Sequence, residues 1–237
     1  MTAAVTFPYR GKMGVFNCPE ARVREYTEIE VYEAYDAFHN SESKVTESDI
    51  NAARCLYAWP EETSMHRASQ DAMKGDERIR ECLSETRDSY LGDIGEQDYQ
   101  ETRTEISALV SSFMSIDWVG PAVATKILHL HKPNLIPIID SHVLLFLTGT
   151  DTQNISKSKQ VDLVLYAIDV IWKNLRANRD VLGPLSQDLG TLQFPLTKLR
   201  IHDILTWTIW KWDIKGKAFG CAEKGRIPVR TLGCWKV

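Results

Sequence analysis

The fold is decided by residues 113–147, which read FMSIDWVGPAVATKILHLHKPNLIPIIDSHVLLFL. Apolar residues recur at helical spacing just before and into this stretch, which predicts an amphipathic helix over 101–116. Gly120 breaks that pattern, and Pro121 suits the first position of a second helix. A short apolar connector bounded by two prolines then leads to Asp140, where we expect a further helix to begin.

The rest of the chain predicts an all-α fold. Apolar residues follow helical spacing over 23–38, 46–59, 160–177 and 197–212, and 61–104 is acidic enough to suggest short helices and loops. Thr46 is the expected N-cap of its helix, with Asp49 in the first turn. No stretch alternates convincingly as a strand would. We divide the chain into an N-terminal segment (1–22), a helical domain (23–212, with hairpin and Asp motif at 106–147) and a basic tail (213–237).

Composition excludes several classes of protein. The chain has 237 residues, of which 43% are hydrophobic and 25% charged, with a mean hydropathy of −0.26. These values are ordinary for a globular domain, and no apolar run reaches the roughly 18 residues of a membrane helix. The N-terminus resembles neither a signal nor a transit peptide. Five scattered cysteines without a CxxC pattern indicate reduced thiols, and we expect a cytoplasmic protein that does not contact a membrane.

Charge is divided unequally along the chain. The net charge is −4, but residues 116–237 carry 16 Lys and Arg against 10 Asp and Glu. The C-terminal half could therefore meet a polyanion while the N-terminal half stays solvated. Ordinary surface charge explains the asymmetry equally well.

The turn between the two central helices suits a phosphate group. Val119 and Gly120 precede the helix, so the amides of Gly120, Ala122 and Val123 are donors without partners at a helix N-terminus. Gly120 can take a positive φ and lets another backbone approach closely. Lys126, one turn further, adds a positive charge. The alternative is a plain helical hairpin with a glycine turn.

Asp140 is the candidate for chemistry. As an N-cap it would be held ionised by helix amides. A fixed carboxylate at the edge of a groove can stabilise an oxocarbenium-like sugar or orient a water molecule against C1′ of a nucleotide. An ordinary N-cap is the alternative. His142 either contacts a phosphate or supports Asp140, or is a packed or surface histidine.

This stretch resembles the helix-hairpin-helix and Gly/Pro-Asp motif of endonuclease III-like DNA glycosylases. The resemblance rests on the turn, the helix after it, the connector and the Asp-Ser-His-Val segment. Gly120 matches the second hairpin glycine, Ala124 the alanine of the following helix, and Asp140 the catalytic aspartate. The resemblance implies two helical subdomains flanking a cleft, with double-stranded DNA as the partner. A weaker similarity over 23–59 and 197–212 extends to a bacterial family of unknown function with the same hairpin.

Three departures refine what the resemblance implies. Trp118 replaces the first hairpin glycine; it either projects toward DNA or, as we favour, is buried under the hairpin. Ala122 replaces the lysine that forms a Schiff base in bifunctional members, and we do not assign that role to Lys126. The cysteines of the family's iron–sulfur cluster are missing, so we expect no cofactor.

These features predict a monofunctional DNA N-glycosylase that removes a modified or mismatched base by Asp-assisted hydrolysis of the N-glycosidic bond. The alternative is a catalytically inactive DNA-binding module on the same scaffold; a scaffold for protein contacts is a third, weaker possibility. A flipped base needs stacking and hydrogen bonds to its edge. Candidates for this base pocket are Asn51, Arg54, Tyr57, Trp59 and Trp118.

The remaining candidates have structural explanations. His129 and His131 lie at the end of the hairpin's second helix, where positive charge suits the helix dipole. Their i, i+2 spacing places them on different helix faces, so we expect no metal site. The tryptophans of the last helix, from Trp207 on, are expected in the core.

Overall fold

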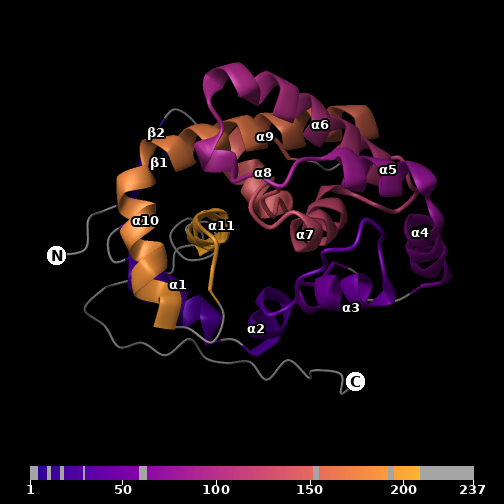
Figure 1. The fold of residues 1–237 in the computed structure, drawn as a ribbon, viewed down its shortest axis with the longest axis horizontal. Coiled ribbons are helices and arrows are strands. Elements are labelled where there is room, and N and C mark those ends of the chain that lie inside the picture. The colour runs from indigo at the N-terminus through magenta and orange to yellow at the C-terminus, as the bar shows by residue number, and fades with distance from the viewer. Residues whose placement is uncertain are drawn as a thin grey trace.

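The computed structural model describes residues 5–9, 12–16, 19–28, 30–58, 63–151, 155–191 and 195–208. In these ranges the chain is built of helices, apart from one two-stranded hairpin (Figure 1). The all-α prediction is confirmed at this level. Trp59, the tryptophans after Trp207 and the basic tail lie outside the described residues.

The N-terminal segment holds a β-hairpin that the sequence did not predict. Strand β1 (Val5–Tyr9) pairs antiparallel with β2 (Lys12–Phe16), with Val5 opposite Phe16. The amide of Thr6 donates to Asn178 Oδ1 (3.1 Å), and Asn178 Nδ2 donates to the carbonyl of Thr6 (2.8 Å). Strands of five residues are too short to display a reliable alternating pattern, which explains the omission.

Two helices replace the single one expected over 23–38. These are α1 (Pro19–Thr27) and α2 (Glu30–Asp36). The next helix, α3 (Glu47–Cys55), begins as predicted: the Thr46 side chain accepts from the Asp49 amide, and the Asp49 side chain accepts from the Thr46 amide. This capping box satisfies two amides at the helix start.

The acidic stretch forms α4 (Ser64–Gly75), α5 (Glu77–Glu85) and the short 3₁₀ helix η1 (Leu91–Asp93). The central helices follow in the predicted order, as α6 (Glu96–Met114), α7 (Pro121–His131) and α8 (Ser141–Thr148). The chain continues through α9 (Lys157–Ala177), α10 (Arg179–Asp188), η2 (Leu189–Thr191) and α11 (Lys198–Thr208). Helix α10 was not predicted, because Pro184 within it is a residue that normally interrupts helices.

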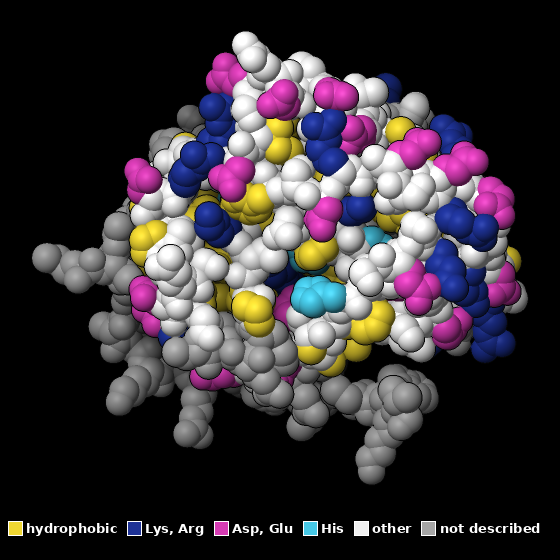
Figure 2. Space-filling model, viewed as in Figure 1, with side chains coloured by type: hydrophobic (Ala, Val, Ile, Leu, Met, Phe, Trp, Pro, Cys, Tyr) yellow, Lys and Arg dark blue, Asp and Glu magenta, His cyan; other side chains and the backbone are white. Residues whose placement is uncertain are grey.

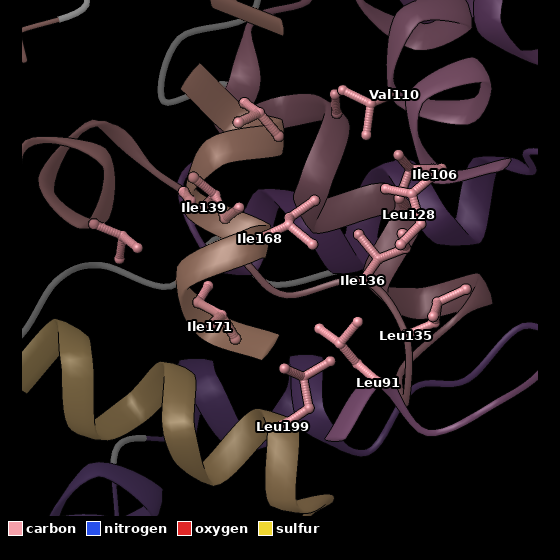
Figure 3. Packing of buried hydrophobic residues seen from close by; sticks show 14 of the residues in the cluster. Leu91, Ile106, Val110, Leu128, Leu135, Ile136, Ile139, Ile168, Ile171 and Leu199 are labelled. Atoms are coloured by element: carbon pink, nitrogen blue, oxygen red, sulfur yellow. The ribbon is translucent and has the colours of Figure 1, made fainter. Parts of the chain in front are cut away.

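Helix α9 organises the core. It packs against α6, α8, α10, α11 and β1, and its inward face is fully buried. Figure 3 shows Ile168 and Ile171 of this helix among apolar side chains from α6, α7, α11 and the connector before α8. Thus α9 joins the middle of the chain to both of its ends.

The ends of the described chain meet on one side of the molecule. Helices α1 and α10 pack on α11, whereas α3 packs on α7 and α5 on α6 (Figure 1). No helix among the described residues has both the length and the apolar character needed to cross a bilayer.

The two histidines at the end of α7, His129 and His131, are buried. His129 Nδ1 donates to the carbonyl of Ile136 (2.6 Å), and burial lowers the pKa of His129 to about 3. The ring is therefore neutral, and the expected interaction with the helix dipole is wrong for this residue. His131 contacts the carbonyl of Glu42 and lies 3.6 Å from the Asp49 carboxylate. Both histidines hold neighbouring segments together.

A buried ion pair joins the second helix to the last. Arg200 Nε donates to Asp36 Oδ1 (2.7 Å), and Arg200 Nη2 donates to the Tyr26 hydroxyl (2.6 Å). Arg200 and Asp36 are both almost fully buried. Burial raises the pKa of Asp36, and the facing guanidinium opposes that rise.

Removing one charge of this pair should destabilise the protein strongly. We expect Asp36→Asn to reduce the free energy of unfolding by roughly 3–5 kcal/mol, because Arg200 would remain buried without a counter-charge. Thermal and denaturant unfolding measure this loss. Asp71→Asn, in an exposed pair with Lys74, is the matched control and should change stability by less than about 0.5 kcal/mol. Equal effects of the two substitutions would contradict this account.

Candidate functional site

Asp140 is the N-cap of α8, as predicted. Its Oδ1 accepts from the amides of His142 and Val143, both at 2.9 Å. No hydrogen bond within the described part of the chain uses Oδ2. One carboxylate oxygen of Asp140 is therefore anchored by helix amides, and the other is open to a ligand.

The connector before Asp140 is fixed by buried polar side chains. Asp203 Oδ2 accepts from the Ile138 amide (2.8 Å). The Thr125 hydroxyl accepts from the Ile139 amide (2.9 Å) and contacts the Ile139 carbonyl (3.2 Å). These contacts tie the connector to α7 and α11, and so position Asp140 relative to both helices.

A pocket of about 540 Å³ opens in front of Asp140. It is bounded by residues of α1, α2, α7, α8 and α11 and by the turn after α3. Figure 2 shows a hollow on the face where α7, α8 and α11 of Figure 1 approach α2. Its volume lies within the usual range for small-ligand sites.

One wall of the pocket is aromatic. Tyr26 and Tyr32 are stacked with ring centroids 4.5 Å apart, and Trp207 meets their edges at 5.7 and 5.9 Å. Burial raises the pKa of Tyr32 to about 12, with nearby Tyr57 adding to the rise. The hydroxyls therefore remain protonated at neutral pH, and the wall offers flat apolar surface together with hydroxyl donors.

Lys126 lies inside this pocket and not on the outer surface of the hairpin. Its side chain is buried, and Nζ donates to the carbonyl of Leu56, the C-cap of α3. Burial lowers the pKa of Lys126 to about 8; Asp140 opposes the shift and Arg200 adds to it. Lys126 therefore lines the same pocket as Asp140, and its contact with a phosphate at the hairpin stays a prediction.

Helix α7 begins with donors that lack protein partners. Gly120 is its N-cap without a side-chain cap, and no hydrogen bond of the described residues uses the amides of Ala122 or Val123. The amide of Val119 instead donates to Ile116 (3.3 Å), and the Val119 side chain is buried. The amides of Gly120, Ala122 and Val123 therefore remain as candidates for binding an anion.

The unusual backbone at the hairpin belongs to Trp118, not to Gly120. Trp118 has φ 63°, whereas Gly120 has φ −101° and open space where a Cβ would stand. The suggested positive φ at Gly120 is wrong, whereas close approach of another backbone to Gly120 stays a prediction. Trp118 is 58% exposed, with the ring of His66 6.5 Å away, so burial under the hairpin is wrong as well. The position expected to hold glycine keeps the left-handed backbone without the glycine.

Of the proposed base-pocket residues, the structure places Tyr57 in the pocket. Tyr57 has φ 59° and is 44% exposed at the pocket edge. Asn51, Arg54 and Trp118 are exposed and do not line it. His142 is exposed and lines it beside Asp140.

Sequence reasoning missed most of the pocket wall. Tyr26, Tyr32, Arg200 and Asp203 line the pocket, as does Trp207, which was expected in the core. The available indication was polar atoms on apolar helix faces: hydroxyls in the first helices, and Arg200 with Asp203 three positions apart in the last. Among the described residues no cluster of His, Cys, Asp and Glu could hold a metal ion.

The comparisons assign a family without assigning an activity. The chain belongs to a family of unknown function, DUF6308, whose model matches residues 20–209. The match includes every helix that bounds the pocket except the first residue of α1. No curated protein and no solved structure matches the chain.

Burial of Lys126 makes a testable statement about stability. Folding disfavours the charged form of Lys126, so burial of the charged amine destabilises the protein below pH 8. This loss of stability disappears as the pH rises from about 8, the pKa of Lys126 in the folded protein, toward 10.5, its ordinary pKa. We expect Lys126→Met to raise Tm at pH 7 by about 2–4 °C, after allowing for the lost hydrogen bond to Leu56. The difference between variant and wild type should shrink at pH 10. Calorimetry at both pH values measures this difference in Tm. If the variant gained less Tm over wild type at pH 7 than at pH 10, the proposed cost of burying the charged amine would be refuted.

Proposed function

We propose that this protein is a monofunctional DNA N-glycosylase, which hydrolyses the bond between C1′ and a modified or mismatched base. The observation that carries the proposal is the position of Asp140. One carboxylate oxygen is anchored by helix amides, and the residue borders an aromatic pocket large enough for a base.

The shape of the site suits a base rotated out of a duplex. Such a base needs a flat surface for stacking and polar groups for its edge. The Tyr26–Tyr32 stack with Trp207 offers the former, and Lys126 and Arg200 offer donors. The pocket lies between α1, α2 and α11 on one side and α3, α7 and α8 on the other, which supports a cleft between two helical subdomains.

The start of α7 suits the sugar–phosphate strand that carries the base. Its free amides at Ala122 and Val123 attract an anion without a basic side chain. Ala122 also lines the pocket, so a phosphate at these amides would sit next to the cavity that receives the base.

In the proposed reaction, the C1′–N bond breaks and leaves positive charge on the sugar. The Asp140 carboxylate stabilises that charge and orients the water molecule that adds to C1′. Ala122 supplies no amine, so no Schiff base forms at that position and the strand remains intact. The proposal requires no cofactor.

Asp140→Asn tests the chemistry. Asparagine is also a good N-cap, so the fold should persist while base release falls by a factor of about 10²–10⁴, as when a charge-stabilising group is removed. The assay measures abasic sites in duplexes that each carry one altered base. Asp76→Asn is the matched control, because Asp76 caps α5 through the Ile79 amide (3.0 Å) far from the pocket.

Equal release by wild type and Asp140→Asn would remove Asp140 from the mechanism. Duplex binding without release of any base would favour the alternative, a catalytically inactive DNA-binding module.

Gly120→Asp tests the strand contact. Aspartate at this N-cap should satisfy the free amides and leave α7 at least as stable, because the site is sterically open. Its charge would repel a phosphate, so duplex affinity should fall at least about tenfold, equivalent to 1.4 kcal/mol. Fluorescence anisotropy measures binding across a salt series, since affinity should also weaken as salt rises.

Gly95→Asp serves as the charge-matched control, because Gly95 is the uncapped N-cap of α6. Equal losses in both variants would indicate general charge repulsion and argue against a specific contact at α7.

A further inference from the structure

Lys126 is more deeply buried than its structural contact requires. Its Nζ donates one hydrogen bond, to the C-cap carbonyl of α3, and no other partner of Nζ is found in the described ranges. Lys132 makes the same kind of contact, from Nζ to the carbonyl of Thr86, the C-cap of α5, at 2.7 Å. Lys132 does so from a half-buried position. Capping a helix therefore does not explain a lysine residue that is only 6% exposed within a pocket.

The amine and the carboxylate of the site share one cavity. Lys126 projects from α7, and Asp140 begins α8. The other titratable and charged groups that line the cavity are Tyr26 of α1, Tyr32 of α2, Tyr57 after α3, His142 of α8, and Arg200 with Asp203 of α11. Arg200 is paired with Asp36, and Asp203 with the Ile138 amide and His202. Of the two lysine and arginine side chains that the described residues place in this cavity, Arg200 has a carboxylate partner and Lys126 has none.

The proton affinity of the Lys126 amine suits donation of a proton near pH 7. Burial lowers the pKa of Lys126 to about 8, while Asp140 keeps it from falling further. At pH 7 the amine is protonated, yet it releases a proton far more readily than an exposed lysine. An acid of this strength is well matched to general acid catalysis at physiological pH.

Resting on the proposed function, we propose that Lys126 is the catalytic acid that protonates the departing base. As the C1′–N bond breaks, its electron pair moves onto the base, and a proton moves from Nζ to a ring nitrogen or carbonyl oxygen of that base. Water adds to C1′ and loses its proton by way of Asp140 to solvent, and the neutral amine regains a proton from solvent. Base and sugar leave as neutral products, and Lys126 and Asp140 return to their starting forms.

The assignment also narrows the substrate class. A neutral base departs as a poor anionic leaving group unless it is protonated, whereas an N7-alkylated purine already carries a positive charge. Lys126 is therefore useful for neutral altered bases with an acceptor facing the amine. The pocket suits neutral altered bases, and Lys126 does not accelerate the release of cationic bases.

The test compares Lys126→Met, Lys132→Met and wild type in single-turnover release of uracil, hypoxanthine and 7-methylguanine from duplexes. For the neutral bases, we expect the wild-type rate to fall above pH about 8. Lys126→Met should be slower by about 10²–10⁴-fold at pH 7 and should lose this decline. Release of 7-methylguanine should change by less than about threefold, and Lys132→Met should match wild type throughout.

The two proposals fail in different ways. A wild type that releases none of the tested bases refutes the proposed function and this inference with it. An active wild type with Lys126→Met within threefold on neutral bases, or equally slow on 7-methylguanine, refutes the role of Lys126 alone. The pH profile of wild type gives an independent result: a rate that stays constant from pH 7 to 10 overturns the assignment.

Discussion

Two buried hydrogen bonds, from the Ile138 amide to Asp203 and from the Ile139 amide to Thr125, determine where the site lies. The apolar connector between α7 and α8 turns at Lys132, whose carbonyl accepts from the Leu135 and Ile136 amides, but the amides of Ile138 and Ile139 find no backbone partner among the described residues. A buried amide without a partner is costly, and side chains of α7 and α11 supply the acceptors. Asp140 follows directly and inherits its position from this arrangement. The helices that hold the connector are also those that carry Lys126 and Arg200.

The pocket combines groups that a protein selected only for stability would avoid. Lys126 and Arg200 are both cationic and both buried, and Arg200 alone has a carboxylate in contact. Repulsion between the cations contributes to the lowered pKa of Lys126. Functional sites commonly retain such unfavourable charges, because an apolar replacement would stabilise the fold and remove the chemistry.

Rules that depend only on neighbouring residues predicted where the helices begin, including the helix that Asp140 caps. Thr46, Asp140 and Pro121 each fix a helix start through chemistry confined to one turn, and all three lie where the sequence placed them. Long-range packing decided the rest. Lys126 turns inward because its face of α7 is buried. That burial depends on α3 and α11, which lie outside the 35 residues that predicted the motif. The conformational freedom of glycine suggested a positive φ at Gly120, whereas Trp118 holds the left-handed backbone, because the φ values of a turn depend on the turn as a whole.

Helix α11 comes from the end of the described chain, and its partners in the site lie much earlier in the sequence. Arg200 pairs with a residue 164 positions earlier, and Asp203 with one 65 positions earlier. Contacts of such long sequence separation form late, since the entropy of closing the intervening chain must be overcome first. During synthesis, α7 and α8 would emerge from the ribosome with the Ile138 amide still unpaired and the cavity without the residues that α11 contributes. The pocket is thus completed only when α11, the last helix of the described residues, docks, so the proposed activity would require this late contact to have formed.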